Sequence, residues 1–242
     1  MPVRPESANR EAVELIRRLQ NEPHAEPSSA LRELAERAVD AVPGAEYAGI
    51  TVIGPKGTVE SVAATHPYAR LLDDIQHTHR QGPCVTAAWE QHTMHVSDLA
   101  ADDRWPDYRR EVIDRTPIRS ILSFELFTAK KKLRALNYYS ESANAFDGNS
   151  IEVGLVYATH MAIAWNILMR DAQFRSALAS RDIIGQAKGI IMERFDVDAG
   201  HAFDLLTRLS QSSNIPLVEV AERLVTTKVL DGGHDEGRRR PK

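Results

Sequence analysis

The chain has 242 residues, of which 43% are hydrophobic and 26% charged, and its formal net charge at pH 7 is −4. These values are typical of a soluble globular protein with one large or two smaller domains, and they exclude wholesale disorder and a broadly basic nucleic-acid-binding surface. The single cysteine, Cys84, excludes an internal disulfide and a zinc site built on several thiolates. The N-terminus has no apolar signal core and no run of about 18 apolar residues occurs, so we expect a cytoplasmic protein without a membrane anchor.

The N-terminal part of the chain predicts two helices of different character. Residues 1–27 are polar and contain four prolines. Between the prolines, Val13, Ile16 and Leu19 lie at helical spacing, which predicts a short amphipathic helix with flexible flanks. From residue 28 onward, apolar side chains recur at spacings of three and four. This spacing predicts a helix that is capped by Ser28 or Ser29 and stopped by Pro43-Gly44.

Two β-hairpins are predicted from stretches rich in β-branched and aromatic residues. Residues 47–53 and 58–65 flank a turn of glycine, proline and lysine, and residues 120–128 and 133–140 flank a basic turn at 130–132. Between the hairpins we expect a helix over 68–79, a short helix over 84–89, a strand over 94–96 and an irregular helical stretch over 102–116. The order predicts an α+β domain in which helices cover an antiparallel sheet.

A long helical segment follows, with no proline before Pro216. Residues 150–195 are predicted to form one helix, or two in line with a kink near Asp171. Apolar residues form a seam at spacings of three and four: Leu155, Ala158, Ala162, Trp165, Met169, Phe174 and Leu178. One small domain cannot cover so long a helix, so we expect a coiled coil within a homodimer.

Two further helices are predicted at the C-terminal end. Asp198 is the expected N-cap of the first, whose apolar stripe is Ala202, Leu205, Leu206 and Leu209. Pro216 opens the second, whose stripe is Leu217, Val220, Ala221, Leu224 and Val225. Residues 229–242 are predicted to form a disordered tail.

The helix over residues 181–195 has two unlike faces. One face is apolar, and the opposite face carries Arg181, Gly185, Lys188, Gly189 and Met192. Each glycine inside a helix costs about 1 kcal/mol relative to alanine, so a close approach to the backbone is expected there. Two interpretations remain open: a nucleic acid whose phosphate is bound by Lys188, or a second helix that packs tightly against the glycines.

Motifs in residues 180–225 resemble an ANTAR domain. They are the AKGIIM stretch at 187–192, the pattern AF--L---S at 202–210 and the VA pair at 220–221. ANTAR domains are three-helix RNA-binding modules that stabilise paired hairpins in nascent transcripts and so prevent a terminator from forming. The resemblance implies transcription antitermination, a domain over 169–228, and dimers that bind two hairpin loops at once.

The expected RNA-binding residues are polar positions and glycines outside the apolar stripes. From residue 170 to residue 228, eight Lys or Arg balance eight Asp or Glu, so recognition must come from shape and from unpaired loop bases. The candidates are Lys188, Arg181, Gln186, Gly185, Gly189, Arg194, Arg208 and Gln211. Phe195 and Phe203, the aromatic residues of the segment 180–225, are expected to pack in the core.

Residues 28–168 resemble a GAF domain. The resemblance rests on Gly82-Pro83-Cys84, Val96-Ser97-Asp98-Leu99, Arg104-Trp105-Pro106, Arg119-Ser120, Leu136-Asn137-Tyr138-Tyr139-Ser140 and Ala145-Phe146-Asp147. Arg134 stands where the family commonly has glycine, which leaves the hairpin geometry at that strand open. GAF domains are small-molecule-sensing or dimerising modules, so the resemblance implies a regulatory domain with an unidentified ligand.

One cluster of side chains has ligand chemistry suited to zinc, iron or haem: His77, His79, Cys84, His92 and His95. Their spacing matches no recognised zinc site, so no metal or cofactor is predicted. Some GAF-fold proteins reduce methionine sulfoxide with several cysteines, which one cysteine cannot do. Neither a phosphate-binding loop nor a nucleophile elbow occurs, so we do not expect an enzyme.

The sequence therefore predicts a cytoplasmic antitermination regulator in which a GAF-like sensor controls an RNA-binding ANTAR domain. Two alternatives remain. In one, the C-terminal helices bind a protein partner in place of RNA; in the other, the protein is a haem or redox sensor.

Overall fold

The computed structural model describes residues 26–54, 57–85, 92–126 and 133–231, together with isolated positions before residue 18. The chain divides into two units, residues 1–169 and residues 170–242. Most of the segment predicted at 1–27 and the predicted basic turn at 130–132 lie outside the described residues, as do residues 86–89 of the predicted helix over 84–89.

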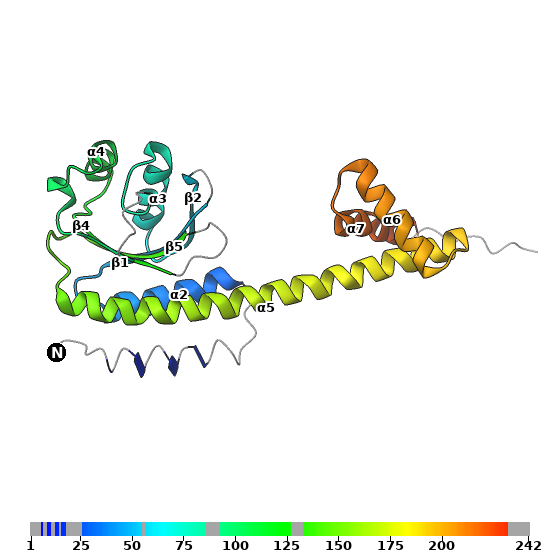
Figure 1. The fold of residues 1–242 in the computed structure, drawn as a ribbon, viewed down its shortest axis with the longest axis horizontal. Helices are drawn as coiled ribbons and strands as arrows, with labels where there is room; N and C mark the ends of the chain where they lie inside the picture. Colours follow the sequence, from blue (N-terminus) through cyan, green and yellow to red (C-terminus); the bar gives the residue numbers. More distant parts are fainter. Residues whose placement is uncertain are drawn as a thin grey trace, which may run out of the picture. The chain divides into compact units, whose positions relative to one another are not determined.

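Within the described residues, the first unit contains a five-stranded sheet in the order β2-β1-β5-β4-β3, with every neighbouring pair antiparallel (Figure 1). The strands are β1 (Tyr47–Ile53), β2 (Val59–Ala64), β3 (Thr93–Val96), β4 (Ser120–Glu125) and β5 (Leu133–Ser140). The predicted α+β class is confirmed. Both predicted hairpins pair in the sheet, and β5 has the predicted bounds.

Strand β5 is regular at Arg134, the position where the family commonly has glycine. Arg134 pairs with Val52 of β1, in a register that continues without a shift to Tyr47 opposite Tyr139. The Arg134 guanidinium lies 5.0 Å from the centroid of the Trp165 ring. Arginine therefore fits this strand because an aromatic ring stacks against its side chain.

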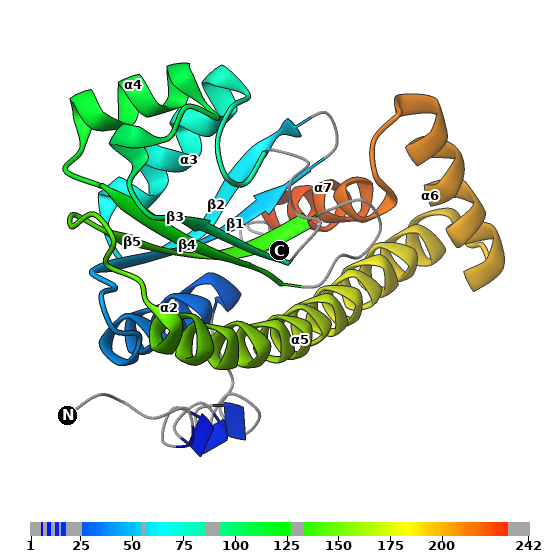
Figure 2. The same ribbon diagram turned by 60° about the vertical axis from the view of Figure 1, so that its left-hand side comes forward.

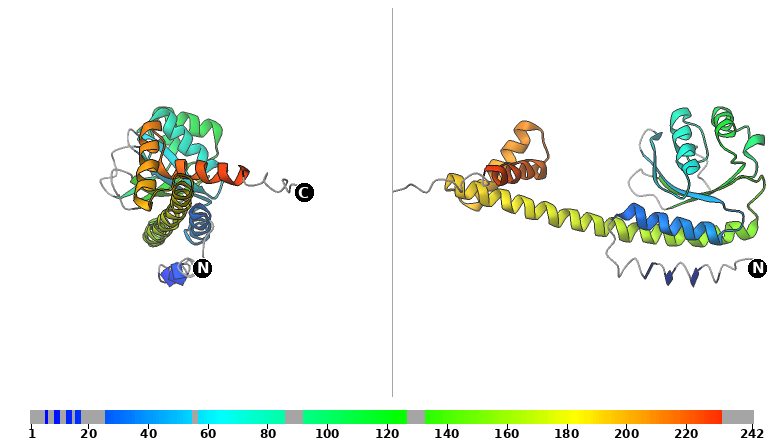
Figure 3. Two further views of the ribbon diagram at one scale, coloured as in Figure 1. Left: turned by 90° about the vertical axis from the view of Figure 1, so that its right-hand side faces the viewer. Right: turned by 180° about the vertical axis from the view of Figure 1, so that it is seen from behind.

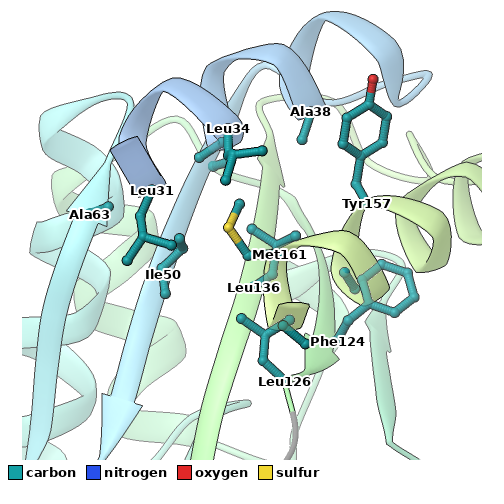
Figure 4. Packing of buried hydrophobic residues seen from close by; sticks show 14 of the residues in the cluster. Leu31, Leu34, Ala38, Ile50, Ala63, Phe124, Leu126, Leu136, Tyr157 and Met161 are labelled. Atoms are coloured by element: carbon teal, nitrogen blue, oxygen red, sulfur yellow. The ribbon is translucent and has the colours of Figure 1, made fainter. Parts of the chain in front are cut away.

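One face of the sheet is covered by helices α2 (Pro27–Ala41) and α5 (Gly148–Phe195), which lie side by side (Figures 1 and 3). Figure 4 shows the resulting core, in which Leu34 from α2 and Met161 from α5 point toward Leu136 of the sheet. The predicted caps of α2 were wrong. The helix begins at Pro27, and its N-cap is Glu26, whose side chain makes no capping bond; proline at the first position needs no capped N–H.

The opposite face is covered by α3 (Pro67–His79) and α4 (Pro106–Arg115) (Figure 2). A short 3₁₀ helix, η3 (Leu99–Ala101), precedes α4, so the predicted irregular stretch over 102–116 is a regular helix only from Pro106. The motif residues Asp98 and Arg119 meet here. Arg119 Nε donates to Asp98 Oδ1 at 3.0 Å, which joins the start of η3 to the start of β4.

Helix α5 is a single helix without a break at Asp171. Part of the seam that was predicted to lie between two copies is instead buried within one copy. Ala158, Ala162 and Trp165 are buried in the core of the first unit, whereas Leu155 is 53% exposed. Among the described residues, α5 is the one helix that is long and apolar enough to cross a membrane. However, 56% of its most apolar stretch is buried inside the protein, as is usual for the core helix of a soluble domain.

In the second unit, the end of α5 packs with α6 (Ala199–Ser213) and α7 (Leu217–Asp231). The fully buried core comprises Ala187, Ile191, Ala202, Leu206, Val220 and Ala221. The predicted cap is confirmed, since Asp198 Oδ1 accepts the backbone N–H of His201 at 2.8 Å. Helix α7 ends at Asp231, so the first three residues of the predicted tail are helical and the rest lie outside the described residues.

The expected burial of four apolar residues in the second unit was wrong. Phe195, Phe203, Leu205 and Leu209 are all exposed. The reason is geometric: three short helices that share one small core bury a narrow stripe of each helix, and on α6 that stripe consists of Ala202 and Leu206. Apolar residues outside the stripe face solvent.

Candidate functional site

The glycine face of α5 is open. Gly185 and Gly189 are exposed, and a Cβ atom built on either would meet nothing within 4 Å among the described residues. Gly154, on the same helix, is different, because a Cβ atom there would lie 2.6 Å from Cε2 of Phe124. Packing within the described chain thus explains Gly154 but gives no reason for Gly185 or Gly189.

Lys188 lies between the two glycines along α5 and faces α6. Its Nζ atom is 5.9 Å from the centroid of the Phe203 ring. No carboxylate of the described residues forms an ion pair with Lys188, so its ammonium group has no anionic partner there. The site therefore combines a cation, an exposed aromatic ring and an uncovered stretch of helix backbone.

The structure gathers some of the sequence-predicted site residues and separates others. At about 100° per residue, Arg181 falls on the same face of α5 as Gly185, Lys188 and Gly189. Gln186 and Arg194 lie outside this face, and Gln186 Nε2 donates to Asp182 Oδ2 at 2.9 Å. Arg208 and Gln211 are exposed on α6, and no hydrogen bond or ion pair among the described residues joins their side chains to α5.

Phe203 is the residue that sequence reasoning missed at this site. It was assigned to the core because phenylalanine in an amphipathic helix is usually buried. A signal was nonetheless present: at about 100° per residue, Phe203 falls at the edge of the stripe defined by Ala202 and Leu206, beyond both buried residues.

The histidines of the first unit do not form a shared ligand set. His79 Nε2 lies 2.5 Å from Glu111, and His92 Nδ1 lies 2.7 Å from Glu125. Among the residues that the structure describes, no group of three His, Cys, Asp or Glu side chains could hold a metal ion.

Cys84 is fully enclosed in the same unit. Its backbone N–H donates to Gln76 Oε1 at 2.8 Å, and its Sγ donates to Asn137 Oδ1 at 3.4 Å. Burial raises the pKa of the Cys84 thiol to about 12, with a smaller contribution from the nearby Asp73 carboxylate. A buried thiol with a raised pKa is a poor nucleophile, which does not favour a redox-sensing role for Cys84.

Asp73 of α3 is the central group of this buried polar network. Thr51 Oγ1 donates to Asp73 Oδ1 at 2.9 Å, and Asn137 Nδ2 donates to Thr51 Oγ1 at 2.8 Å. Burial raises the pKa of the Asp73 carboxyl to about 7, although the Thr51 hydrogen bond works in the opposite direction. The network joins β1, β5 and α3 through side chains that are almost fully buried.

An α+β domain with helices on both sheet faces, continued by one helix into a small helical unit, defines a two-domain protein. Family comparison identifies both parts. The chain belongs to the GAF domain family, whose model matches residues 24–166, and an ANTAR domain follows at residues 172–225. GAF and ANTAR domains are typically soluble, non-enzymatic regulatory modules, and together they make this chain a sensor-regulated antitermination regulator.

Solved GAF and sensor domains are similar to this chain at low sequence identity. The phycoerythrobilin-bound GAF domain of a cyanobacterial phytochrome is 12% identical, with a TM-score of 0.52, and the match covers 71% of this chain and 100% of that chain. The GAF domain of a phosphoenolpyruvate-protein phosphotransferase from Coxiella burnetii is 14% identical, covering 70% and 98%, with a TM-score of 0.48. A domain of a sensor histidine kinase from Sinorhizobium meliloti 1021 is 19% identical, covering 59% and 95%, with a TM-score of 0.46. No curated protein sequence matches the chain.

Proposed function

We propose that the protein is a cytoplasmic regulator whose ANTAR domain binds paired hairpins in nascent RNA, and that its GAF domain controls this binding. The observation that supports the proposal is the open face of Gly185 and Gly189 beside Lys188, a cation without an anionic partner in the described chain. Glycines that cost helix stability and contact nothing internal fit a surface where RNA approaches the backbone closely.

Recognition by shape fits the charge of this domain. Between residues 170 and 228, eight basic side chains are balanced by eight acidic ones, so counterion release supplies little affinity. Unpaired loop bases and helix shape are the features that proteins use to select RNA without a broad basic surface. The proposed target is therefore the loop of a hairpin.

A homodimer would present two such surfaces at once. Exposed apolar side chains occur along α5 in both units: Leu155 and Ile163 in the first, Phe174 and Leu178 in the second. Large apolar side chains at helical spacing on a solvent-facing helix favour self-association. Binding of the first hairpin then raises the effective concentration of the second, which increases the affinity for a paired target.

Gel shifts test the paired-binding proposal. The probe is a two-hairpin RNA recovered by sequencing transcripts that co-purify with the protein, and each hairpin alone serves for comparison. We expect the two-hairpin RNA to bind at least tenfold more tightly. Equal affinity for the double and single hairpins would contradict paired binding.

A charge reversal tests the site. Lys188→Glu should weaken RNA binding about tenfold and flatten its salt dependence, because one phosphate contact is lost. Arg223→Glu is the matched control, since it makes the same change on α7, where Arg223 pairs only with Glu219 across an exposed helix turn. Equal losses in both variants would show a general charge effect and would argue against a site at Lys188.

One further candidate function has a specific observation in its favour. Phe174, Leu178, Arg181, Gly185, Lys188 and Met192 follow one another at alternating spacings of four and three, the pattern of a coiled-coil seam. On this reading the glycine face packs against a helix of a protein partner. Purified protein that retains no hairpin RNA at physiological salt would favour this function over RNA binding.

A further inference from the structure

We infer that Phe203 is a stacking platform for one unpaired base of the RNA loop, and that Lys188 binds the phosphate beside that base. The inference rests on the proposed function and adds to it a residue and a mode of recognition. It assigns the aromatic ring, rather than a set of basic side chains, as the main source of affinity at this site.

The exposure of Phe203 is the first observation. Its side chain is 41% exposed, whereas Ala202 and Leu206, its neighbours toward the core, are 0% and 1% exposed. An aromatic ring in this position leaves apolar surface in water that a flat partner can cover. Every base has a flat face, so a ring of this kind accepts a base without the need for a shaped pocket.

The position of Lys188 is the second observation. At 5.9 Å from the ring centroid, the ammonium group lies at the outer limit of a cation–π contact, so the ring holds it only weakly. With no carboxylate partner among the described residues, the ammonium group is available to an anion close to the ring. In a nucleotide, the base and its phosphate are joined through one sugar, so a ring and a cation from neighbouring helices fit the two ends of one nucleotide.

The open backbone next to Lys188 is the third observation. Nothing in the described chain stands within 4 Å of a Cβ atom built on Gly185 or Gly189. A sugar-phosphate chain that continues from the nucleotide at Phe203 can therefore pass along α5 in contact with its backbone. Lys188 and Phe203 lie on the facing sides of α5 and α6, and the two glycines lie on the open face of α5 beside Lys188.

The experiment compares two substitutions on α6 with matched exposure. Phe203→Leu removes the ring but keeps an apolar side chain, and Leu205→Ala changes a residue that is 42% exposed on the other side of the same helix. Phe203→Tyr keeps the ring and serves as the conservative variant. The probe is a labelled hairpin RNA, taken from a library with a randomised loop that has been enriched on the full-length wild-type protein, and binding is measured by fluorescence anisotropy at several salt concentrations.

Phe203→Leu should weaken binding between about fivefold and a hundredfold, the range for loss of one stacked base, with the salt dependence unchanged. Phe203→Tyr and Leu205→Ala should bind within about twofold of the wild type. Lys188→Gln should weaken binding and also flatten the salt dependence. In the Phe203→Leu variant, removal of the stacked base from the RNA should cause no further loss.

Two results would overturn the inference, and they are distinguishable from failure of the proposed function. Wild-type affinity in a folded Phe203→Leu variant would show that no base stacks on this ring. A Phe203→Leu variant that changes the oligomeric state while keeping its RNA affinity would assign the ring to a second copy of the chain. Wild-type protein that enriches no hairpin from the library would refute RNA binding itself, and the stacking assignment with it.

Discussion

The Asp73 carboxyl is a buried acid that faces no cation in the described chain. Around it lie the Thr51 hydroxyl from β1, the Gln76 amide from α3, the Cys84 thiol, and the phenols of Tyr108 and Tyr139. Asp74 adds a like charge that raises the pKa of Asp73 further. Since none of these groups can neutralise a carboxylate, the folded protein favours the protonated acid, whose pKa rises to about 7.

We predict that the first unit loses stability as the pH rises from about 4 to about 7. The pKa of Asp73 is 3.8 in the unfolded chain and about 7 in the folded protein. Between these pH values the folded state binds one proton more than the unfolded state, so the free energy of unfolding falls as the pH rises. The total loss of unfolding free energy is at most about 4 kcal/mol. Asp73→Asn should remove most of this slope and be more stable than the wild type at pH 8. Denaturant unfolding monitored by tryptophan fluorescence measures the stability of the first unit selectively, since all three tryptophans precede residue 170.

An unchanged pH slope in Asp73→Asn would show that another group is responsible. Asp114→Asn is the control, because it removes an exposed carboxyl of α4 that is not part of the buried network.

A second residue-scale prediction concerns Gly189. Gly189→Ala should stabilise α5 by up to about 1 kcal/mol, because alanine favours the helix and its Cβ atom meets nothing. The same methyl group should weaken RNA binding by keeping the RNA away from the backbone. Thermal unfolding by circular dichroism and RNA anisotropy measure the two effects on one sample.

Gly154→Ala is the contrasting variant. It should destabilise the first unit, because the added Cβ atom would collide with the Phe124 ring. If Gly189→Ala raised stability and left RNA affinity intact, the glycine would not serve RNA binding.

At the scale of elements, local chemistry was enough to place most helices and strands. Proline in the first turn marks the start of α2, α3 and α4, and Pro216 directly precedes α7. Asp198 caps α6 as its residue type predicts. The bounds of β5 follow from a run of β-forming residues between a basic turn and a polar loop. These features are local, so they can be read without knowledge of the fold.

Burial was harder to predict than secondary structure, because it depends on what covers each face. Leu205 and Leu209 have the spacing of core residues, but no further layer among the described residues of the second unit covers them. Trp165 was assigned to a seam between two copies, yet α2 and the sheet bury it within one copy. The candidate site shows the same limit: Lys188 and the glycines were predicted, and Phe203 was not.

We predict that α5 carries the dimer contact through Phe174 and Leu178. The double variant Phe174→Glu/Leu178→Glu should be monomeric in sedimentation experiments, because two charges at exposed apolar positions repel across a self-associating helix. It should keep its affinity for a single hairpin within about twofold and lose the advantage for the two-hairpin RNA.

Ser176→Glu is the control, since it adds a charge on another side of the same exposed helix turn. A double variant that remained dimeric would move the contact elsewhere, and one that lost single-hairpin binding would show that these residues also serve the RNA site.

At the scale of the whole molecule, the two units have unequal cores. The first has two buried clusters, one on each face of the sheet, whereas the core of the second is built on six fully buried residues, three of them alanine. A small core supplies less hydrophobic stabilisation, so the two units should not unfold as one.

Hydrogen exchange measures this difference. Amides of α6 and α7 should exchange before those of β1 and β5, because the smaller unit opens at lower free energy. RNA should slow exchange in α6 and α7 and in the last turns of α5 if binding occurs at the proposed site. Simultaneous exchange of both units would show that they unfold cooperatively.

The enclosure of Cys84 has a practical consequence. Because the only thiol of the chain is buried and stays protonated at neutral pH, thiol-specific dyes and spin labels should leave the native protein unmodified. New cysteines introduced on solvent-facing positions can therefore be labelled selectively without first removing the natural one. Distances between labelled sites then become measurable in solution, with and without signals that reach the sensor domain.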